Sequence, residues 1–365
     1  MIHRWFSQNV DLVIYINGTG AITPQKTFDG RFVFEANTTT EPILWCQEPD
    51  YKTCIDPRAA RRMSRVIKMG VASALIALKD GGVECPDAIV TGSGFGCMAD
   101  TELFLTSIIK NEEKFLNPAP FIHSTHNTIS SQIALLKKCT GYNQTYVHGP
   151  ISFESALLDG MMLLDEEKAQ SVLVGGVDEM TSNLFSITSR FDKWKEKPNA
   201  SECGFFGSDS KGSIAGEGSV FFLLSKNRNE NSYGRIIDVD TFLNPNNQFD
   251  IKTCVDQFLN KAHVKIDDLN LCLIGKSGDN RFDTIYDDFI SLMSENCSFG
   301  YFKHLCGEYL TASSFAVWMS AQILNTQILP KEIIASGGKK NNFKNILIYN
   351  QYRNKYHSLI LLSIC

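Results

Sequence analysis

The sequence predicts a layered α/β fold made of two successive halves, and three observations support this prediction. Short runs rich in β-branched and aliphatic residues alternate with longer stretches of helical periodicity, which is the pattern of layered α/β proteins. The polar segment 227–231 (Asn-Arg-Asn-Glu-Asn) has nothing apolar to bury, and the same alternation begins again after it. Of the 365 residues, 43% are hydrophobic, which suffices for a sizeable core and excludes wholesale disorder. We therefore expect an N-terminal half in residues 1–230 and a shortened C-terminal half in residues 231–365.

The predicted elements follow in order along the chain. A strand at 13–16 is closed by a glycine turn at 17–20, and an amphipathic helix at 58–77 ends at Gly81 and Gly82. Further strands of the first half are expected at 88–91, 144–148, 171–174 and 219–224, and further helices at 101–109, 127–138 and 152–164. After the linker, strands are expected at 235–239, 271–274, 345–349 and 358–362, and helices at 252–261, 283–293 and 311–324. The repeated pattern suggests an internal duplication.

Composition excludes several classes of function. With 35 basic residues against 40 acidic ones, the net charge is −5 and no basic stripe is available to neutralise phosphates, so nucleic acid is not an expected partner. The longest early apolar run, 10–16, contains Asp11 and is far shorter than the roughly 20 residues of a membrane-spanning helix. It also lacks the pattern of a secretory signal. The 11 cysteines stand singly with no Cys-x-x-Cys pair, so we expect neither a metal site nor a disulfide framework, and a cytoplasmic location fits best.

The segment Gly92-Ser-Gly-Phe-Gly96 follows a predicted strand, as a nucleotide-binding loop would. It lacks the G-x-G-x-x-G spacing, and no acidic residue closes a second strand about 20 residues further on. We therefore interpret it as a tight structural turn. No Walker loop, His-Glu-x-x-His or Gly-x-Ser-x-Gly motif occurs either, so the sequence predicts no cofactor.

Six motifs occur in a fixed order between Asn17 and Glu308. They are Asn17-Gly-Thr-Gly-Ala-Ile-Thr-Pro24, Arg58-Ala-Ala-Arg-Arg-Met-Ser-Arg65, Val90-Thr-Gly-Ser-Gly-Phe-Gly96, Val174-Gly-Gly-Val-Asp178, Phe206-Gly-Ser-Asp-Ser-Lys-Gly-Ser-Ile-Ala-Gly-Glu-Gly218 and Lys303-His-Leu-Cys-Gly-Glu308. With these motifs the chain resembles the β-ketoacyl-acyl-carrier-protein synthases, or ketosynthases, of the thiolase fold. The resemblance implies an α/β, thiolase-like fold with two similar βαβαβαββ-type halves in five layers, and an obligate dimer.

Ketosynthase chemistry requires a cysteine thiolate at a sharp strand-to-helix turn and two imidazoles that stabilise the enolate and polarise thioester oxygens. Counting back without gaps from Val174-Gly-Gly-Val-Asp178, the nucleophile position falls on Pro150, which has neither a nucleophile nor an N–H. A shift of two residues brings Ser152 there instead. A serine without an adjacent base is a poor nucleophile, and we interpret Ser152 as a helix cap. No cysteine lies between Cys139 and Cys203, so no small shift restores a thiol.

The two imidazole positions depart from the family pattern as well. The family's Asn-Ala-His-Gly-Thr is replaced by Gly275-Lys276-Ser277-Gly278-Asp279, where Lys276 is interpreted as a solvated loop residue. The family's Lys-x-x-x-Gly-His becomes 303–308, with Glu308 in place of the histidine. An ionised Glu308 cannot donate a hydrogen bond to a thioester oxygen, and we expect it to pair with Lys303. His304 is adjacent in sequence but is expected to point elsewhere.

The family's C-terminal loop, Gly-Phe-Gly-Gly-Thr-Asn, is replaced by residues 350–356, in which Tyr352 is the nearest counterpart of the family's gating phenylalanine. Proteins of this description exist in the family: chain-length factors lack the cysteine, pair with an active ketosynthase and limit product length. The run 145–159 resembles the ketosynthase-like subunits of aryl-polyene and flexirubin pigment clusters. The resemblance thus implies an inactive subunit that pairs with an active ketosynthase or with itself and acts with acyl carrier protein.

Two sets of residues are assigned to this role. Aromatic side chains near the motifs are predicted to face the substrate channel, although core packing explains each one as well; they are Phe153, Phe205, Phe206 and Tyr352. Basic residues of one motif are predicted to contact the acidic carrier protein; they are Arg58, Arg61, Arg62 and Arg65. Two alternatives stay open: a divergent but active 3-oxoacyl synthase or acyltransferase that uses Ser152, His148, His304 or Glu308, and a homodimeric binder of acyl chains or carrier protein.

Overall fold

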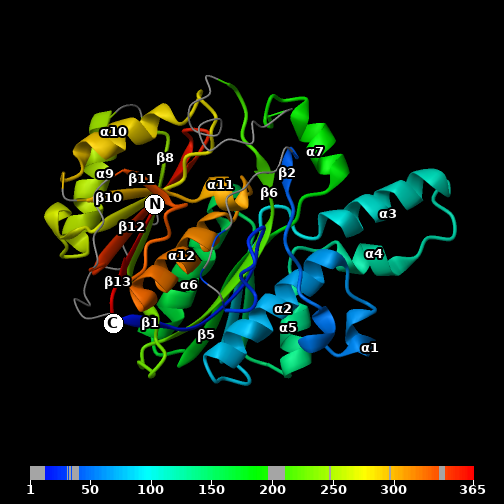
Figure 1. Cartoon of the computed structure of the whole chain (residues 1–365). Coiled ribbons are helices and arrows are strands. Elements are labelled where there is room, and N and C mark those ends of the chain that lie inside the picture. The colour runs from blue at the N-terminus through cyan, green and yellow to red at the C-terminus, as the bar shows by residue number, and fades with distance from the viewer. Residues whose placement is uncertain are drawn as a thin grey trace.

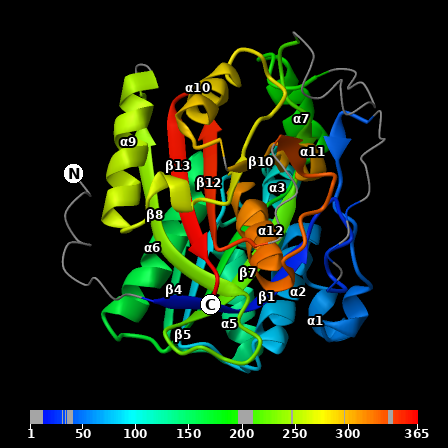
Figure 2. The ribbon, with the colours of Figure 1, turned by 60° about the vertical axis from the view of Figure 1, so that its left-hand side comes forward.

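The computed structural model describes residues 13–30, 32, 34, 41–195, 210–245, 248–295, 297–336 and 342–365 (Figures 1 and 2). The predicted channel residues Phe205 and Phe206 lie outside these residues. The helices are α1 (Pro57–Ala60), α2 (Arg65–Asp80), α3 (Met98–Lys110), α4 (Pro118–His123), α5 (Thr128–Lys137), α6 (Ser152–Asp165), α7 (Ser182–Ser189), α9 (Gln248–Lys261), α10 (Thr284–Leu292), α11 (Lys303–Cys306) and α12 (Ser313–Thr326). The strands are β1 (Ile14–Ile22), β2 (Ile43–Leu44), β3 (Ala88–Gly92), β4 (Tyr142–Tyr146), β5 (Ser171–Asp178), β6 (Ala215–Gly216), β7 (Gly218–Ser225), β8 (Gly234–Leu243), β9 (Leu271–Ile274), β10 (Ser298–Tyr301), β11 (Ile334–Ser336), β12 (Asn345–Tyr352) and β13 (Tyr356–Ser363).

The strand pairing repeats once along the chain, as the predicted duplication requires. Within the described residues, the large sheet has the order β11-β10-β9-β12-β13-β8-β1-β7-β5-β3-β4. From β1 outward the pairs β1–β7 and β7–β5 are antiparallel, whereas β5–β3 and β3–β4 are parallel. From β8 outward the same sequence of pairings recurs in β8–β13, β13–β12, β12–β9 and β9–β10. The two sets meet where β1 pairs antiparallel with β8. With the intervening helices, each set reads βαβαβαββ.

Helices lie in three layers around the two halves of the sheet, which confirms the predicted five-layer arrangement. α2 packs on β1 and β7, and it forms one outer layer together with α5. α6 and α12 contact strands of both halves and so form the middle layer. α9 and α10 pack together, and their residues join the cluster that covers the far face of β9 and β12. Figure 1 shows α6 and α12 side by side in the centre of the molecule. α12 is buried from Ser313 to Leu324, and apart from Gln322 its residues there are apolar or small, as burial on every side requires.

Two predicted elements differ from the structure. The glycines at Gly18 and Gly20 do not close the first strand; β1 runs through them to Ile22. A Cβ on Gly18 would meet the carbonyl oxygen of Ala77 at 2.3 Å and one on Gly20 that of Ser73 at 2.0 Å, so the glycines allow α2 to lie directly on the strand. The single helix expected at 58–77 is divided into α1 and α2, because Ser64 is extended and the Met63 side chain turns into the core.

Candidate functional site

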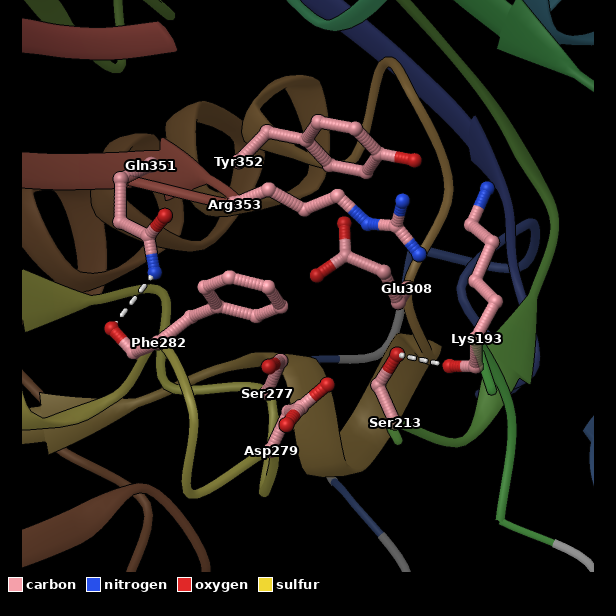
Figure 3. Close-up of a pocket in the computed structure, with 9 residues that line it drawn as sticks. All are labelled: Lys193, Ser213, Ser277, Asp279, Phe282, Glu308, Gln351, Tyr352 and Arg353. Atoms are coloured by element: carbon pink, nitrogen blue, oxygen red, sulfur yellow. Dashed lines mark hydrogen bonds between the residues drawn. The ribbon is translucent and has the colours of Figure 1, made fainter. Parts of the chain in front are cut away.

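Four segments that are far apart in the sequence meet around one small pocket (Figure 3). They are the segments after α7 and before β6, the loop after β9, the short segment that follows α11, and the end of β12 with the turn to β13. The lining residues are Lys193, Ser213, Ser277, Asp279, Phe282, Glu308, Gln351, Tyr352 and Arg353. The pocket therefore combines the two predicted imidazole positions and the altered C-terminal loop, whereas residues of the nucleophile turn do not line it.

The predicted ion pair between Lys303 and Glu308 is present. Lys303 Nζ donates to Glu308 Oε2 at 2.7 Å, with the lysine 1% exposed and the glutamate 7% exposed. Gly307 has a φ of +77°, and a Cβ there would meet the Cα of Gly216 at 2.5 Å, so the chain can turn into this geometry only with glycine. The Glu308 N–H donates to the carbonyl of Ile214, and this bond fixes the backbone beside the pocket.

Lys303 also faces two further buried carboxyl groups. Burial raises the pKa of Asp283 to about 6, and the charge of Lys303 acts in the opposite direction. Burial likewise raises the pKa of Glu154, against the hydrogen bond from Ser358 and the charge of Lys303. Ser358 Oγ donates to Glu154 Oε1 at 2.8 Å. One ammonium group thus stabilises negative charge on three neighbouring elements.

The loop after β9 differs from the solvated segment that was expected. Lys276 is not a free loop lysine: its Nζ lies 2.6 Å from Asp287 Oδ1, and its side chain is 17% exposed. Burial alone would lower the pKa of Lys276, but the hydrogen bond with Asp287 raises it above the ordinary value. Asp283 accepts the backbone N–H groups of Ser277 and Gly278, which holds the loop against the start of α10. Lys276 is therefore charged and forms an ion pair with Asp287.

Neither Pro150 nor Ser152 in the nucleophile turn offers a group that can act as a nucleophile. Pro150 lies in a short 3-10 turn, Gly149–Ile151, directly before α6, as suits a residue without an N–H. Ser152 is fully buried; its Oγ accepts the N–H of His148 at 2.9 Å and donates to the carbonyl of Gly149 at 2.7 Å. The interpretation as a helix cap was wrong, because Ile151 is the cap residue of α6, and Ser152 is the first residue of the helix, with its hydroxyl closing the preceding turn.

Two further residues named for this region have local roles. His148 lies at the surface, where its Nδ1 contacts Ser155 Oγ at 2.9 Å. Phe153 is fully buried and packs on Phe222 with ring centroids 6.0 Å apart, in the middle layer of the fold. As predicted, His304 points away from the pocket, since its Nε2 contacts the carbonyl of Glu332 at 2.7 Å.

A tight hairpin turn replaces the family's glycine-rich loop. Arg353 and Asn354 both have positive φ, +55° and +52°, and the N–H of Lys355 donates to the carbonyl of Tyr352. Gln351 holds the turn by donating from Nε2 to the carbonyl of Phe282 at 3.1 Å. The ring of Tyr352 lies under two cations, with Lys193 Nζ 5.4 Å from its centroid. In Figure 3 the Arg353 side chain extends across the pocket toward Glu308.

The structure separates the basic motif into two parts. Arg58, Arg61 and Arg62 are exposed on and after α1. Arg65 instead turns inward, donating from both terminal nitrogens to the fully buried Glu217 and from Nε to Glu48. Three arginines are therefore available to a partner, whereas Arg65 links α2 to the segment before β7.

Asp178 was not recognised from the sequence as a structural centre. Its Oδ1 accepts the N–H groups of Gly94 and Phe95, and its Oδ2 accepts the N–H and hydroxyl of Thr311. Burial raises the pKa of this carboxyl to about 6. These bonds confirm that 92–96 is a structural turn, tied to the segment before α12. The only signal in the sequence was the acidic residue at the end of a predicted strand.

The pocket residues Lys193, Asp279 and Arg353 were also missed. Asp279 binds Arg281 through both carboxylate oxygens, and Arg281 also donates to the carbonyl of Asp192. These residues are distant in sequence and follow no known spacing. Among the described residues, no group of His, Cys, Asp and Glu side chains could hold a metal ion, and no helix there is long and apolar enough to cross a membrane.

The fold and the family follow from comparison with known proteins. Three solved structures resemble the chain: "The ishigamide ketosynthase/chain length factor" (TM-score 0.76, 15% identity, 97% of this chain and 99% of that chain), a β-ketoacyl synthase from Burkholderia phymatum STM815 (0.76, 12%, 97% and 100%), and a type II polyketide synthase acyl-carrier protein in complex with its ketosynthase bound to the hexaketide (0.73, 13%, 97% and 100%). The fold is therefore thiolase-like. Residues 46–229 match the model of the β-ketoacyl synthase N-terminal domain, and the chain belongs to that family. No curated protein matches the sequence.

Proposed function

We propose that this protein is a chain-length-factor-type subunit that has lost the condensing chemistry of its family. In this role it pairs with an active ketosynthase and shapes the products of acyl-carrier-protein-dependent fatty acid or polyketide biosynthesis, of the kind that makes polyene pigments. The observation that carries the proposal is the state of the catalytic positions. Pro150 has no nucleophile, the Ser152 hydroxyl is bonded to two backbone groups, and Glu308 is held by Lys303.

The chemistry of these groups supports inactivity. A serine hydroxyl becomes a nucleophile only when a base removes its proton, and the Ser152 proton is donated to a carbonyl instead. A carboxylate at Glu308 accepts hydrogen bonds, whereas the family's imidazole donates one to the thioester oxygen. His304 contacts the Glu332 carbonyl, and burial lowers the pKa of its imidazole to about 4, so it is not a charged donor at neutral pH.

An unpaired sheet edge supports pairing with a second subunit. Among the strands that the structure describes, β4 is the last on its side of the sheet, and Tyr142–Gln144 along it are exposed. An open edge strand offers backbone donors and acceptors to another chain. Large apolar side chains are also exposed on α3, α4, α5 and the β4 region; they are Leu103, Leu105, Ile109, Phe121, Ile122, Leu135, Tyr142 and Val147. Such apolar exposure is typical of a surface that is covered in an assembly.

The remaining assignments belong to this proposal. The exposed Arg58, Arg61 and Arg62 contact the acidic carrier protein, and Arg65 supports them by anchoring α2. Tyr352 lines the pocket and limits its depth. Phe153 is fully buried and is not one of the lining residues, so its part in this proposal is to pack the core.

The test is an assay of malonyl-carrier decarboxylation and condensation. The purified chain is assayed alone and after co-expression with an intact ketosynthase encoded beside it. Turnover only in the complex, with loss of turnover when the partner's nucleophilic cysteine is replaced, supports the proposal. Turnover by this chain alone that is abolished by Ser152→Ala or Glu308→Gln would establish an active enzyme and refute it.

Two controls sharpen the result. A cerulenin-type cysteine reagent is expected to label the partner ketosynthase but no peptide from residues 145–160, which contain no cysteine. In the complex, Glu308→Gln is expected to leave the rate of condensation within about twofold of the parent once the complex is saturated. A shift in product length with Tyr352→Ala at unchanged partner affinity supports a length-setting role, and unchanged products count against it.

A further inference from the structure

Two of the cysteines, Cys85 and Cys139, lie against each other at the surface. They are at the N-terminal ends of their strands, whereas the pocket is at C-terminal strand ends. Cys85 Sγ and Cys139 Sγ are 2.6 Å apart, with Cys85 exposed and Cys139 partly exposed. Cys85 stands in the segment that leads into β3, and Cys139 in the segment between α5 and β4. Because β3 and β4 are parallel neighbours, both thiols are at the N-terminal ends of their strands. The pocket lies at the C-terminal ends of the equivalent strands in the other half.

The surrounding backbone holds both thiols in place. Next to Cys85, Asp87 Oδ2 accepts the N–H groups of Gln170 and Ser171 at 2.9 Å each and the Ser171 hydroxyl at 3.2 Å. Close to Cys139, Gly141 packs so tightly on this segment that an added Cβ would meet the carbonyl oxygen of Asp87 at 2.1 Å. The two segments are thus fixed to each other independently of the sulfur atoms.

The duplicated fold supplies an internal comparison. In the second half the strands equivalent to β3 and β4 are β9 and β10, and they also bring two cysteines together. Cys272 Sγ and Cys297 Sγ lie 3.4 Å apart, but both residues are buried, so an oxidant in solution does not reach them. The two pairs therefore lie on equivalent strand pairs, although Cys85 and Cys139 precede their strands and Cys272 stands inside β9, and the two pairs differ in access to solvent.

We propose that Cys85 and Cys139 are an oxidation site at which a disulfide forms within the chain when a peroxide or a small disulfide is present. With hydrogen peroxide, the exposed Cys85 reacts first to give a sulfenic acid and water. The Cys139 sulfur then attacks the Cys85 sulfur, forming the S–S bond and releasing a second water, so that two thiols and one peroxide give one disulfide and two waters. The bond ties the start of β4, the open edge of the sheet, to the segment before β3.

The order of reaction follows from the environment of the two thiols. Burial, and then the contact with Cys85, raise the pKa of Cys139 to about 12, so little Cys139 thiolate exists at neutral pH. Cys85 is the more exposed of the two and meets the oxidant directly. The reaction is reversible by thiols, as a redox-sensitive site requires.

The test uses the purified full-length chain. It is treated with hydrogen peroxide or diamide, the remaining thiols are alkylated, and the peptides are mapped by mass spectrometry. We expect a linked Cys85–Cys139 peptide that dithiothreitol removes, that is absent from Cys85→Ser and Cys139→Ser, and that persists in the matched control Cys54→Ser. The Cys272 and Cys297 peptides are expected to stay reduced until the chain is unfolded.

Three results would overturn the proposal. One is alkylation of both Cys85 and Cys139 after an oxidant dose that fully oxidises an added small thiol. Another is a Cys85 cross-link between two copies of the chain in place of the internal bond. The third is linkage of the buried Cys272–Cys297 pair in the folded chain at the same rate, since this would show that solvent access does not select the site.

Discussion

The buried ion pair at the pocket yields the sharpest prediction about stability. Replacing Lys303 with methionine removes the ammonium group that lies 2.7 Å from Glu308 Oε2. The same ammonium group lowers the pKa values of Glu154 and Asp283, which burial raises. Breaking a buried pair by removing one partner costs about 3–5 kcal/mol, because the remaining charge stays without compensation. Since three carboxyl groups lose the same cation here, we expect Lys303→Met to cost about 4 kcal/mol.

Substituting the partner residue, Glu308, is expected to cost less stability than substituting Lys303. In Glu308→Gln the amide oxygen still accepts from Lys303, and the lysine keeps its other two carboxyl neighbours, so the expected loss is about 2 kcal/mol. The double variant should lose about 2 kcal/mol less than the sum of the single variants, since the two side chains interact directly. The exposed pair Lys168–Glu166, 65% and 42% exposed, is the matched control, and Lys168→Met is expected to change stability by less than about 1 kcal/mol.

Guanidinium unfolding at neutral pH, followed by both fluorescence and circular dichroism, measures these differences as shifts in the transition midpoint. The decisive result is the larger loss of stability in Lys303→Met than in Glu308→Gln, because this difference depends on the other carboxyl groups near Lys303. If Lys303→Met proves no more costly than Lys168→Met, or if the two single losses simply add, the argument for a coupled buried pair is refuted.

Three further predictions concern pH, packing and carrier binding. Burial lowers the pKa of the fully buried His357 to about 4 from an ordinary 6.5, so its contribution to stability is complete above pH 6.5 and is lost as the pH falls toward 4. At about 1.36 kcal/mol per unit this is about 3 kcal/mol, and His357→Asn should reduce the loss of stability between those pH values by that amount in denaturant titrations; an unchanged pH profile would contradict it. Gly20→Ala should destabilise the chain by about 3 kcal/mol in the same assay, because its Cβ meets the Ser73 carbonyl at 2.0 Å, whereas Gly82→Ala, with φ +69° and open space around it, should cost about 1 kcal/mol; equal losses would refute the packing argument. Reversing the charge of Arg58, Arg61 and Arg62 together should weaken carrier-protein binding at least about tenfold at low salt, measured by fluorescence anisotropy, with an unchanged melting temperature; unchanged affinity would remove these residues from the carrier contact.

The sequence predicted the fold well where an element is defined by its own residues and those directly beside it. The run 271–274 stands between polar segments, and β9 has the bounds Leu271–Ile274. The strand expected at 13–16 is present, but the turn expected at 17–20 is not, because Gly18 and Gly20 serve a contact with α2, a helix that lies some sixty residues further along the chain. A glycine in the sequence indicates either a turn or a close approach between backbones. The sequence alone does not distinguish the two, which is why the turn was predicted wrongly.

The site was predictable only where neighbours in sequence are also neighbours in space. Lys303 and Glu308 are five residues apart, and their pairing was foreseen from the loss of the imidazole. Lys276 was taken for a solvated residue because its partner, Asp287, belongs to the next helix and gives no motif. The pocket itself combines segments around residues 193, 213, 277 and 351, which no spacing rule connects.

The bonding at the altered positions also explains why the proposed loss of chemistry would not be reversed by single substitutions. A histidine at Glu308 would remove the carboxylate that compensates Lys303, and the nearby ammonium would then disfavour a protonated imidazole. A cysteine at Ser152 would place its sulfur between the His148 N–H and the Gly149 carbonyl, inside α6 and away from the pocket lining. Each reversal would therefore reduce stability without assembling a thiolate beside two imidazoles. Under the proposed function, such a scaffold keeps its layers and its edge strand β4, and selection would act on its contacts with a partner subunit.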